Sequence, residues 1–294
     1  MVAIILVNFN DADDTIDCIK SLSEMKDIEY EIIVVDNCSE DDSINKLEQA
    51  QEIYGFTLLR TECNNGFSSG NNIGIKHAKN AEYYLLLNND TVVKPDFLGK
   101  LINEFQKNPQ CGVSISKILY YSQPDTIWYA GGSFSQRTAR SRHYHFNERN
   151  NINDTLPQKV TFASGCCLCV SKRVIEKIGL LNEQFFLYEE DTEFCYRITE
   201  AGFEIVYVPN SVIYHKVSAS TGQGSPMSQY YTVRNKFSLI RMHFKGMNKV
   251  MAYLYCTAQF LFRCMKKEQS FKYYKSGFRA FIRHETGRAR GDIL

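Results

Sequence analysis

The chain has 294 residues, 44% of them hydrophobic and 23% charged, which is the composition of a folded globular protein and excludes a disordered or fibrous one. The net charge of +1 hides an asymmetry, because residues 241–294 carry 12 Lys and Arg against 3 Asp and Glu, so that segment is +9 and the preceding 240 residues sum to −8. A basic end of this kind indicates an anionic partner, either nucleic acid or a membrane surface.

The amino-terminal sequence MVAIILVNFN has no basic lead, and its apolar run is too short for a signal peptide. We therefore expect the protein to start in the cytoplasm. The ten cysteines lie scattered through apolar stretches, so we expect reduced, buried thiols. Cys166 and Cys169 form a C-x-x-C pattern, but no second pair follows at matching spacing. A buried strand is therefore favoured there over a zinc or redox site.

Strands and helices alternate through the first 90 residues. Apolar runs predict strands at 2–7, 31–36, 56–60 and 83–90, and the segments between them predict helices at 14–25, around 44–47, and after a Gly- and Asn-rich loop at 64–74. Four strands separated by helices indicate right-handed crossovers. The sequence therefore predicts an α/β protein with a doubly wound, mostly parallel sheet of the nucleotide-binding type.

The pattern loosens after Pro95. We expect a helix to residue 107, a strand at 112–118, an aromatic hairpin around Trp128 and a polar surface loop or partly mobile lid at 135–158. Order returns with a helix at 173–178, a helix at 191–201 ended by Gly202, and a strand at 204–209. His215 is expected in a following loop of small polar residues, and helices are expected from about residue 227 onward.

The basic end carries an amphipathic segment. The uncharged stretch 250–262 is too short to span a bilayer. After it come an apolar stripe and a neighbouring row of cations, which are Phe271, Tyr274, Phe278 and Ile282, and Lys272, Lys275, Arg279 and Arg283. Such a stripe is typical of a helix that lies in a membrane interface. The alternative is that the stripe packs on the rest of the protein or on another subunit, with the cations in solvent.

The stretch YYLLLNND, residues 83–90, ends in polar side chains at the edge of the predicted sheet, where ligands of open α/β sheets bind. Asp90 is its only formal charge, and a carboxylate on a rigid strand end suits a divalent cation that binds phosphate oxygens. The residues alone allow a second interpretation, in which Asn88, Asn89 and Asp90 form a turn and cap the next helix.

A second acidic cluster lies about a hundred residues further on, where Glu189, Glu190 and Asp191 begin a predicted helix. The helix dipole alone favours acids at that position. The preceding apolar FFLY indicates a buried approach, in which one carboxylate could act as a general base toward a hydroxyl group. His215 could ligate a metal opposite Asp90, although a lone histidine is more often a surface or capping residue.

Absent motifs narrow the class of enzyme. The first turn, VNFND, contains no G-x-G-x-x-G, which argues against a dinucleotide oxidoreductase, and no glycine-rich basic start, which argues against a sugar nucleotidylyltransferase. Asp36 ends the second strand, where an acid commonly meets a nucleoside. Because no lysine lies near the expected phosphates, a cation held by Asp90 becomes the expected charge neutraliser.

Several blocks in order resemble one known family: VNFN, VVDNCSEDDS, NNGFSSGNNIG, YLLLNND, ASGCCLCVSKRVIEKIGLLNEQFFLYEEDTEFCYR and YH. Together they are similar to family 2 glycosyltransferases of the GT-A fold, particularly the bacterial rhamnosyltransferase-like branch, over roughly residues 1–240. The resemblance implies a GT-A catalytic domain at 1–225, with a nucleotide-binding part at 1–110 and an acceptor part at 111–225. A helical, basic, amphipathic extension would follow at 226–294.

The resemblance also implies roles for individual residues. Asp90 would bind the metal at the family's D-x-D position with His215 as a second ligand, and Glu190 and Asp191 would be the catalytic acidic pair, with Asp191 as the base. The remaining implied contacts, to the nucleoside, the diphosphate, the donor sugar or the acceptor, are Asn10, Asp36, Asn65, Gly70, Asn71, Asn88, Asn89 and Gly165.

These residues imply an inverting glycosyltransferase that depends on Mg²⁺ or Mn²⁺. It would move rhamnose or a hexose from a dTDP- or UDP-sugar to a lipid-linked or polysaccharide acceptor in cell-surface glycan biosynthesis. We expect it at the inner face of the cell membrane, in peripheral contact through the C-terminal helices, and it could be a homodimer. The alternative is an inactive nucleotide-sugar-binding or scaffold protein, because Asn88 replaces an acid. No nucleic-acid-binding motif is recognisable, so no nucleic-acid partner is expected.

Overall fold

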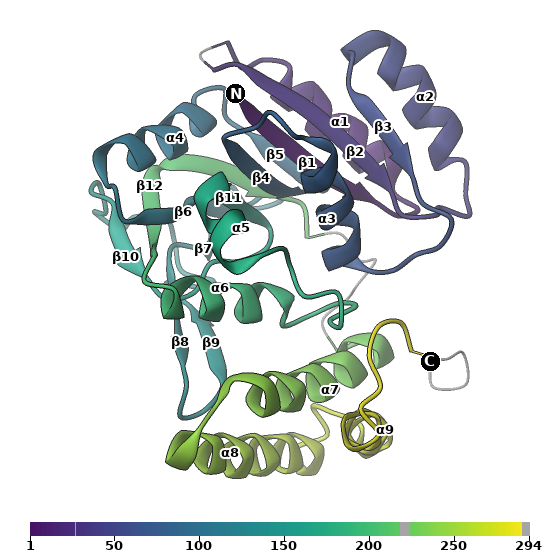
Figure 1. The fold of residues 1–294 in the computed structure, drawn as a ribbon, viewed down its shortest axis with the longest axis vertical. Helices are drawn as coiled ribbons and strands as arrows, with labels where there is room; N and C mark the ends of the chain where they lie inside the picture. The colour runs from purple at the N-terminus through teal and green to yellow at the C-terminus, as the bar shows by residue number, and fades with distance from the viewer. Residues whose placement is uncertain (27, 218–223, 290–294) are drawn as a thin grey trace.

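The computed structural model describes residues 1–26, 28–217 and 224–289 (Figure 1). Its strands are β1 (Val2–Asn8), β2 (Tyr30–Asp36), β3 (Thr57–Arg60), β4 (Tyr83–Asn88), β5 (Thr91–Val93), β6 (Cys111–Tyr120), β7 (Ile127–Tyr129), β8 (Gly132–Ser135), β9 (Arg140–His143), β10 (Gln158–Val160), β11 (Cys167–Ser171) and β12 (Glu204–His215). Its helices are α1 (Ala12–Leu22), α2 (Ser43–Tyr54), α3 (Phe67–His77), α4 (Phe97–Lys107), α5 (Lys172–Ile178), α6 (Glu190–Glu200), α7 (Pro226–His243), α8 (Gly246–Met265) and α9 (Phe271–Ile282).

One half of the central sheet is the predicted parallel one. Strands β3, β2, β1 and β4 lie side by side in that order, and every pair among them is parallel. Strands β1, β2 and β4 are mostly buried apolar runs, as strands covered on both faces are, whereas the edge strand β3 is half-buried. The register pairs Asn8 with Asp36, and Val7 with Asn88, so the carboxyl ends of these strands meet at one edge. The α/β class and the doubly wound arrangement are confirmed.

The other half of the sheet is mixed. Strand β11 runs antiparallel between β4 and β6, while β12 runs parallel to β6. The pairing of Cys167 with Leu87 brings the start of β11 to the end of β4. Strand β12 also pairs with the short β5, with His215 opposite Thr91. His215 is thus the last residue of a strand that is longer than predicted, and the expectation of a loop position was wrong.

Helix α3 replaces most of the loop predicted at 64–74. Glycine and asparagine are poor helix formers, which is why the sequence indicated a loop. The helix lies so close to β1 that a Cβ on Gly70 would be 2.7 Å from the Val7 side chain, and one on Gly74 would be 2.5 Å from Ile5. Close packing on the sheet therefore outweighs the low propensity. Helix α1 also differs, starting at Ala12 and ending at Leu22 instead of spanning 14–25.

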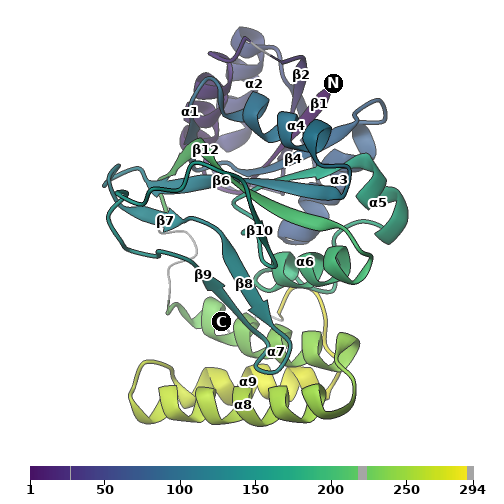
Figure 2. The ribbon, with the colours of Figure 1, turned by 90° about the vertical axis from the view of Figure 1, so that its left-hand side faces the viewer.

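The polar region 135–158 is better ordered than a mobile lid. Strands β8 and β9 form a hairpin, and Ala139 at its tip is buried against the C-terminal helices. Figure 2 shows the hairpin reaching down to α7. Further along, Lys117 and Asp154 form a buried ion pair of 2.7 Å, and the Tyr207 hydroxyl donates a hydrogen bond to the same carboxylate. The expectation of a surface loop or lid was wrong for these parts.

The C-terminal helices form a layer beside the sheet domain (Figures 1 and 2). The middle of the stripe predicted on α9 is covered, because Tyr274 and Phe278 pack against Phe260 and Phe237, whereas Phe271 and Ile282 at its ends are each 57% exposed. Gly277 lies directly against α7, where an added Cβ would be 2.6 Å from the Tyr230 carbonyl oxygen. Packing on the protein thus accounts for the middle of that stripe. Among the described residues, no helix has the length and apolarity needed to cross a bilayer.

Candidate active site

The turn after β4 brings Asp90 and His215 together. The His215 Nε2 atom lies 3.1 Å from the Asp90 Oδ1 atom. His215 is 6% exposed and Asp90 is 8% exposed. Backbone pairing fixes both, since β12 pairs with β5 and the Lys216 N–H donates to the Asp90 carbonyl at 2.9 Å. The Trp128 ring packs edge-on to His215 with centroids 4.7 Å apart. The structure therefore joins the two residues predicted to bind a metal.

This pair fits a divalent cation. A carboxylate oxygen and an imidazole nitrogen are ligands that Mg²⁺ and Mn²⁺ accept, and here the two donor groups face each other. The other ring nitrogen of His215, Nδ1, is buried and has no hydrogen-bond partner among the described residues. Over the described ranges, no cluster of three or more His, Cys, Asp or Glu is arranged to hold a metal.

Other polar groups border the pair. The Asn89 side chain donates to the Thr15 hydroxyl at 2.9 Å, which ties the turn to α1, and Asn88 is half-buried beside it. Burial, followed by the charges of Asp14 and Asp90, raises the pKa of Asp11 to about 6. Sequence reasoning missed Asp11, although it follows the first strand and so had to lie at the same edge of the sheet.

Asp191 lies in the first turn of α6, and backbone donors hold its carboxylate. The N–H of Gly165 donates to Oδ2 at 3.1 Å, and the N–H of Thr192 donates to Oδ1 at 2.6 Å. Burial raises the pKa of Asp191, and these hydrogen bonds oppose the rise. Burial and the charge of Asp191 raise the pKa of Glu190 well above its usual 4.5. The Oε2 atom of Glu190 is buried, and no described residue forms a hydrogen bond with it. Such perturbed carboxyl groups are typical of catalytic sites.

A short connection links the two acidic points. Cys166 accepts a hydrogen bond of 2.9 Å from the N–H of Asn88, two residues before Asp90. Its neighbour Gly165 binds Asp191. A Cβ on Gly165 would lie 3.4 Å from the Phe67 ring at the start of α3 and 3.5 Å from the Cβ of Asp191. Residues 165–166 therefore run from the end of β4 to the start of α6, and the two predicted clusters lie at the same edge.

Helix α7 clamps the segment that leads into Asp191. Tyr188 and Glu189 both have left-handed backbones, with φ of 68° and 71°, which are unfavourable for these residue types. The Asn235 side chain donates to the carbonyls of Leu187 at 2.9 Å and Tyr188 at 2.8 Å. Lys236 forms a buried ion pair of 2.6 Å with Glu189. No motif or spacing pointed to Asn235 and Lys236, because the contact depends on the tertiary fold.

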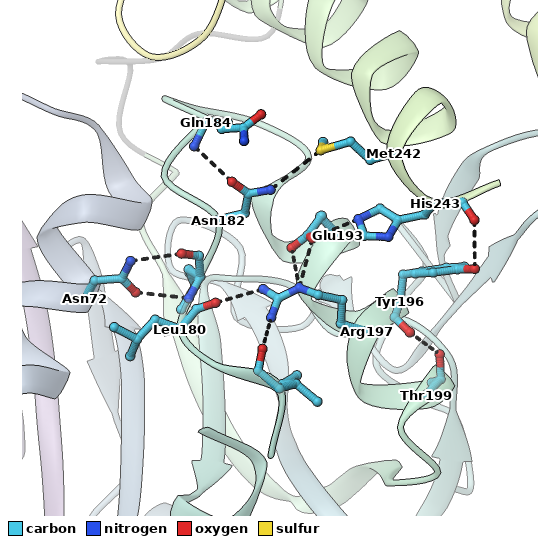
Figure 3. Close-up of polar contacts among 12 residues, drawn as sticks. Asn72, Leu180, Asn182, Gln184, Glu193, Tyr196, Arg197, Thr199, Met242 and His243 are labelled. Carbon is cyan, nitrogen blue, oxygen red and sulfur yellow. Dashed lines mark hydrogen bonds and ion pairs between the residues drawn. The ribbon is translucent and has the colours of Figure 1, made fainter. Parts of the chain in front are cut away.

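A polar network fastens the far side of α6 (Figure 3). Arg197 binds Glu193 at 2.8 Å and donates to the carbonyls of Ile178 and Leu180. His243, the last residue of α7, lies 2.9 Å from the same Glu193 carboxylate. A cavity of about 600 Å³ borders this network, and the acids of the two clusters are not among its lining residues. We therefore assign the network to holding α6 in place.

The side chains of two residues predicted to contact the nucleoside, Asp36 and Asn10, accept hydrogen bonds from neighbouring segments of the protein. Asp36 is 1% exposed, and its carboxylate accepts from the Asn8 amide at 2.8 Å and from the hydroxyl and N–H of Ser39 at 2.6 and 2.9 Å. Asn10 is exposed, and its side chain accepts from the N–H of Glu40 at 2.7 Å. Asp36 thus organises this edge of the sheet, and its direct contact with a nucleoside stays a prediction.

Three residues predicted to line the diphosphate and base pocket, Asn65, Gly70 and Asn71, lie at or in α3, next to Gly66, where the backbone of another segment comes close. Gly66 has φ of +89°, and a Cβ there would lie 2.1 Å from the Phe186 carbonyl oxygen. The Asn37 side chain holds the Gly66 carbonyl at 3.1 Å. Gly70 faces the core, and Asn71 is buried with its amide on the Phe67 carbonyl, whereas Asn65 is exposed. Of these predicted residues, Asn65 alone lies on open surface.

Solved structures with this fold are glycosyltransferases of the GT-A type. The structure titled GalNAc-T7 with UDP, GalNAc and Mn²⁺ superposes with a TM-score of 0.69 at 17% identity, covering 97% of this chain and 58% of that one. A mannosyltransferase, PcManGT from Pyrobaculum calidifontis in complex with GDP-Man and Mn²⁺, gives 0.61 at 13% identity, covering 96% and 86%. At these identities the likeness establishes the fold.

The family follows from the sequence itself. The profile described as Glycosyl transferase family 2 matches residues 3–179, which is more than half of the chain, and the chain belongs to that family. It is 26% identical over 230 residues to the dTDP-rhamnosyl transferase RfbF of Shigella flexneri, covering 75% of this chain and 74% of that protein. It is also 26% identical to the low-salt glycan biosynthesis hexosyltransferase Agl10 of Haloferax volcanii, covering 80% and 74%. The protein is a glycosyltransferase.

Proposed function

We propose that the protein is an inverting, metal-dependent glycosyltransferase that moves a sugar from a nucleotide-diphosphate donor to a hydroxyl group of a lipid-linked or polysaccharide acceptor. The observation that carries the proposal is the meeting of two acidic points at one edge of the sheet. Asp90 lies 3.1 Å from His215, and the adjoining residues 165–166 lead directly to Asp191. Asp90 and His215 suit the binding of a cation, and Asp191 suits the removal of a proton.

Asp191 is the proposed base that takes the proton from the acceptor hydroxyl as the oxygen attacks the anomeric carbon. A single displacement of this kind inverts the anomeric configuration. Burial and the charge of Asp191 raise the pKa of Glu190 well above 4.5, so the two neighbouring carboxyl groups oppose ionising together. The backbone N–H groups of Gly165 and Thr192 donate to the Asp191 carboxylate and support its ionised form.

Asp90 and His215 are the proposed protein ligands of Mg²⁺ or Mn²⁺, with Asn88 and Asn89 beside them. When bound, the cation supplies positive charge to the diphosphate that leaves the sugar. The two ligands are buried and fixed by strand pairing, so they need little rearrangement to bind.

The named relatives suggest the donor. RfbF is named a dTDP-rhamnosyl transferase, and Agl10 is named a hexosyltransferase, so we propose dTDP-rhamnose first and a UDP-hexose next. Residues 1–110 would bind the nucleotide and residues 111–225 the acceptor, with 226–294 as the helical extension. Asn10, Asn65 and the loop around Gly66 are the proposed nucleotide contacts at the open edge, and Asp36 supports them from beneath.

The acceptor and location are proposed from the basic C-terminal end. Residues 241–294 carry a balance of +9, which suits a peripheral place at the inner face of the cell membrane. A growing surface glycan on a lipid carrier would be available there.

The test is a thermal-shift screen of sugar nucleotides with and without Mn²⁺, followed by measurement of nucleoside diphosphate release and of the product anomer by NMR. A true donor raises the melting temperature by mass action, and we expect chelation of the metal to remove the effect. Retention of the anomeric configuration would contradict the mechanism. Donor binding without any diphosphate release, across acceptors and metals, would favour the inactive binding protein.

A further inference from the structure

Helix α8 exposes an apolar face along its whole length. Between residues 247 and 262, every exposed residue is apolar. Counted at 3.6 residues per turn, these positions fall within an arc of about 120°. The large side chains on this face are 40% to 74% exposed, and they are Met247, Val250, Met251, Leu254, Leu261, Phe262 and Met265. Exposed apolar patches of this extent mark interaction sites.

The core does not need this face, because the opposite face of α8 supplies the packing. Ala252, Cys256 and Phe260 are buried, and the Phe260 ring lies 6.0 Å from Phe237 on α7. Cys256 also reaches the Thr138 carbonyl at the tip of the β8–β9 hairpin. Figures 1 and 2 both show α8 at the lower edge of the molecule, with α7 and the sheet above it and α9 beside it. Over the described residues, the apolar face points away from the rest of the protein.

The surroundings of the face are strongly basic. From Lys245 to Arg288 the sequence has ten Lys and Arg against two Glu. The Lys266 ammonium group lies 4.8 Å from the centroid of the Phe262 ring, so a cation adjoins the apolar face directly. Other exposed cations at this end of the layer are Arg263, Lys267, Lys272 and Lys275. An occupant of the face must therefore be apolar in its interior and anionic at its surface.

We propose that the α8 face docks on an anionic lipid bilayer. The helix would lie in the interface, with its apolar side chains among the acyl chains and the neighbouring cations at the lipid phosphates. This inference rests on the proposed membrane location and adds the surface that makes the contact. That surface belongs to α8, whereas the sequence suggested α9. A second copy fits less well, because a symmetric contact through this face would bring two cationic sets together.

The test is flotation with vesicles of phosphatidylcholine alone and of phosphatidylcholine mixed with phosphatidylglycerol. The full chain should bind the mixed vesicles, and binding should weaken as salt is raised. The double variant Leu254→Glu/Phe262→Glu should bind at least about tenfold more weakly, because two charges would enter the apolar layer. Ile53→Glu on α2 and Leu156→Glu are matched controls, since both native side chains are 74% exposed elsewhere, and they should bind like the wild type.

Unchanged binding of the double variant, or equal loss in the controls, would overturn the proposal. So would a wild-type dimer that ignores vesicles and dissociates in the double variant, which would assign the face to a second copy. Melting curves should be alike for all variants, because the replaced side chains are exposed. Nucleoside diphosphate release by the double variant in solution should match the wild type. Since that assay needs no vesicles, the transfer chemistry and the docking surface can fail separately.

Discussion

The two acidic residues of the candidate site, Asp90 and Asp191, are held in place by different parts of the structure. Asp90 is fixed by the sheet, because it follows β4 directly and meets His215 through the pairing of β12 with β5. Asp191 follows a left-handed segment that α7 holds through Asn235 and Lys236. The proposed metal-binding point, Asp90 and His215, is thus built by the sheet, whereas the proposed base, Asp191, depends on the C-terminal helices. Changes on α7 should impair proton removal and spare donor binding.

Asp191→Asn should have the largest effect on activity. The amide keeps the size of the side chain but cannot accept a proton, so we expect kcat to fall by about 10²–10⁴-fold. Donor binding in the presence of Mn²⁺ should stay near the wild-type value. Steady-state kinetics and calorimetry on the same preparation would measure both, and retained turnover would refute the role.

Lys236→Met should be the most damaging change outside the acids. It leaves the Glu189 carboxylate buried without its cation, and breaking a buried ion pair in this way costs about 3–5 kcal/mol of unfolding free energy. Denaturant unfolding and kcat would both report the loss.

The matched control for Lys236→Met is the double variant Glu189→Gln/Lys236→Met, which removes both charges. We expect it to recover most of the lost stability, because no lone charge is left buried. A double variant as unstable as the single one would show that the ion pair is not what holds the segment.

Asn235→Ala should have a smaller effect. It removes the donor for the carbonyls of Leu187 and Tyr188, at a cost of about 1–3 kcal/mol. Since the freed segment leads to the base, kcat should fall while donor affinity is kept. Asn210→Ala is a suitable control, because Asn210 is exposed and donates to Thr155 on another part of the surface. Loss of donor affinity in Asn235→Ala would contradict the division between the two points.

The pH dependence of stability gives the finest test. Burial raises the pKa of Glu190 above 4.5, so the folded protein binds more protons than the unfolded chain between 4.5 and the raised value. Stability should therefore decrease as pH rises through that window. Glu190→Gln lacks this titration. The melting temperature of the variant relative to the wild type should rise with pH across the window, and a difference independent of pH would contradict the assignment.

The position of Asp90 just after β4 could be predicted well from the sequence. The apolar run before Asn88 defines β4, and a parallel sheet gathers its carboxyl ends at one edge. Asp36 was correctly placed at a strand end, but the direction of its side chain was not predictable. Its carboxylate is taken up by Asn8 and Ser39, which lie on neighbouring segments. Strand ends follow from periodicity, whereas hydrogen-bond partners depend on the packed structure.

The surroundings of Asp191 at the start of α6 could be predicted only in part. The acids at the start of α6 indicated a helix start, and α6 does begin at Glu190. The clamp by Asn235 is a contact over 47 residues to Tyr188, which no local pattern encodes. The stripe on α9 shows the same limit. Amphipathicity shows that a face is apolar, and only the structure shows that α7 and α8 cover its middle, Tyr274 and Phe278, and leave its ends exposed.

Calorimetric titration of the donor with and without Mn²⁺, on Asp90→Ala and Asp191→Asn side by side, tests the central claim most directly. The claim predicts that Mn²⁺ no longer strengthens donor binding in Asp90→Ala, whereas it still does so in Asp191→Asn. A wild-type response to Mn²⁺ in Asp90→Ala, or an equal loss in both variants, would contradict it.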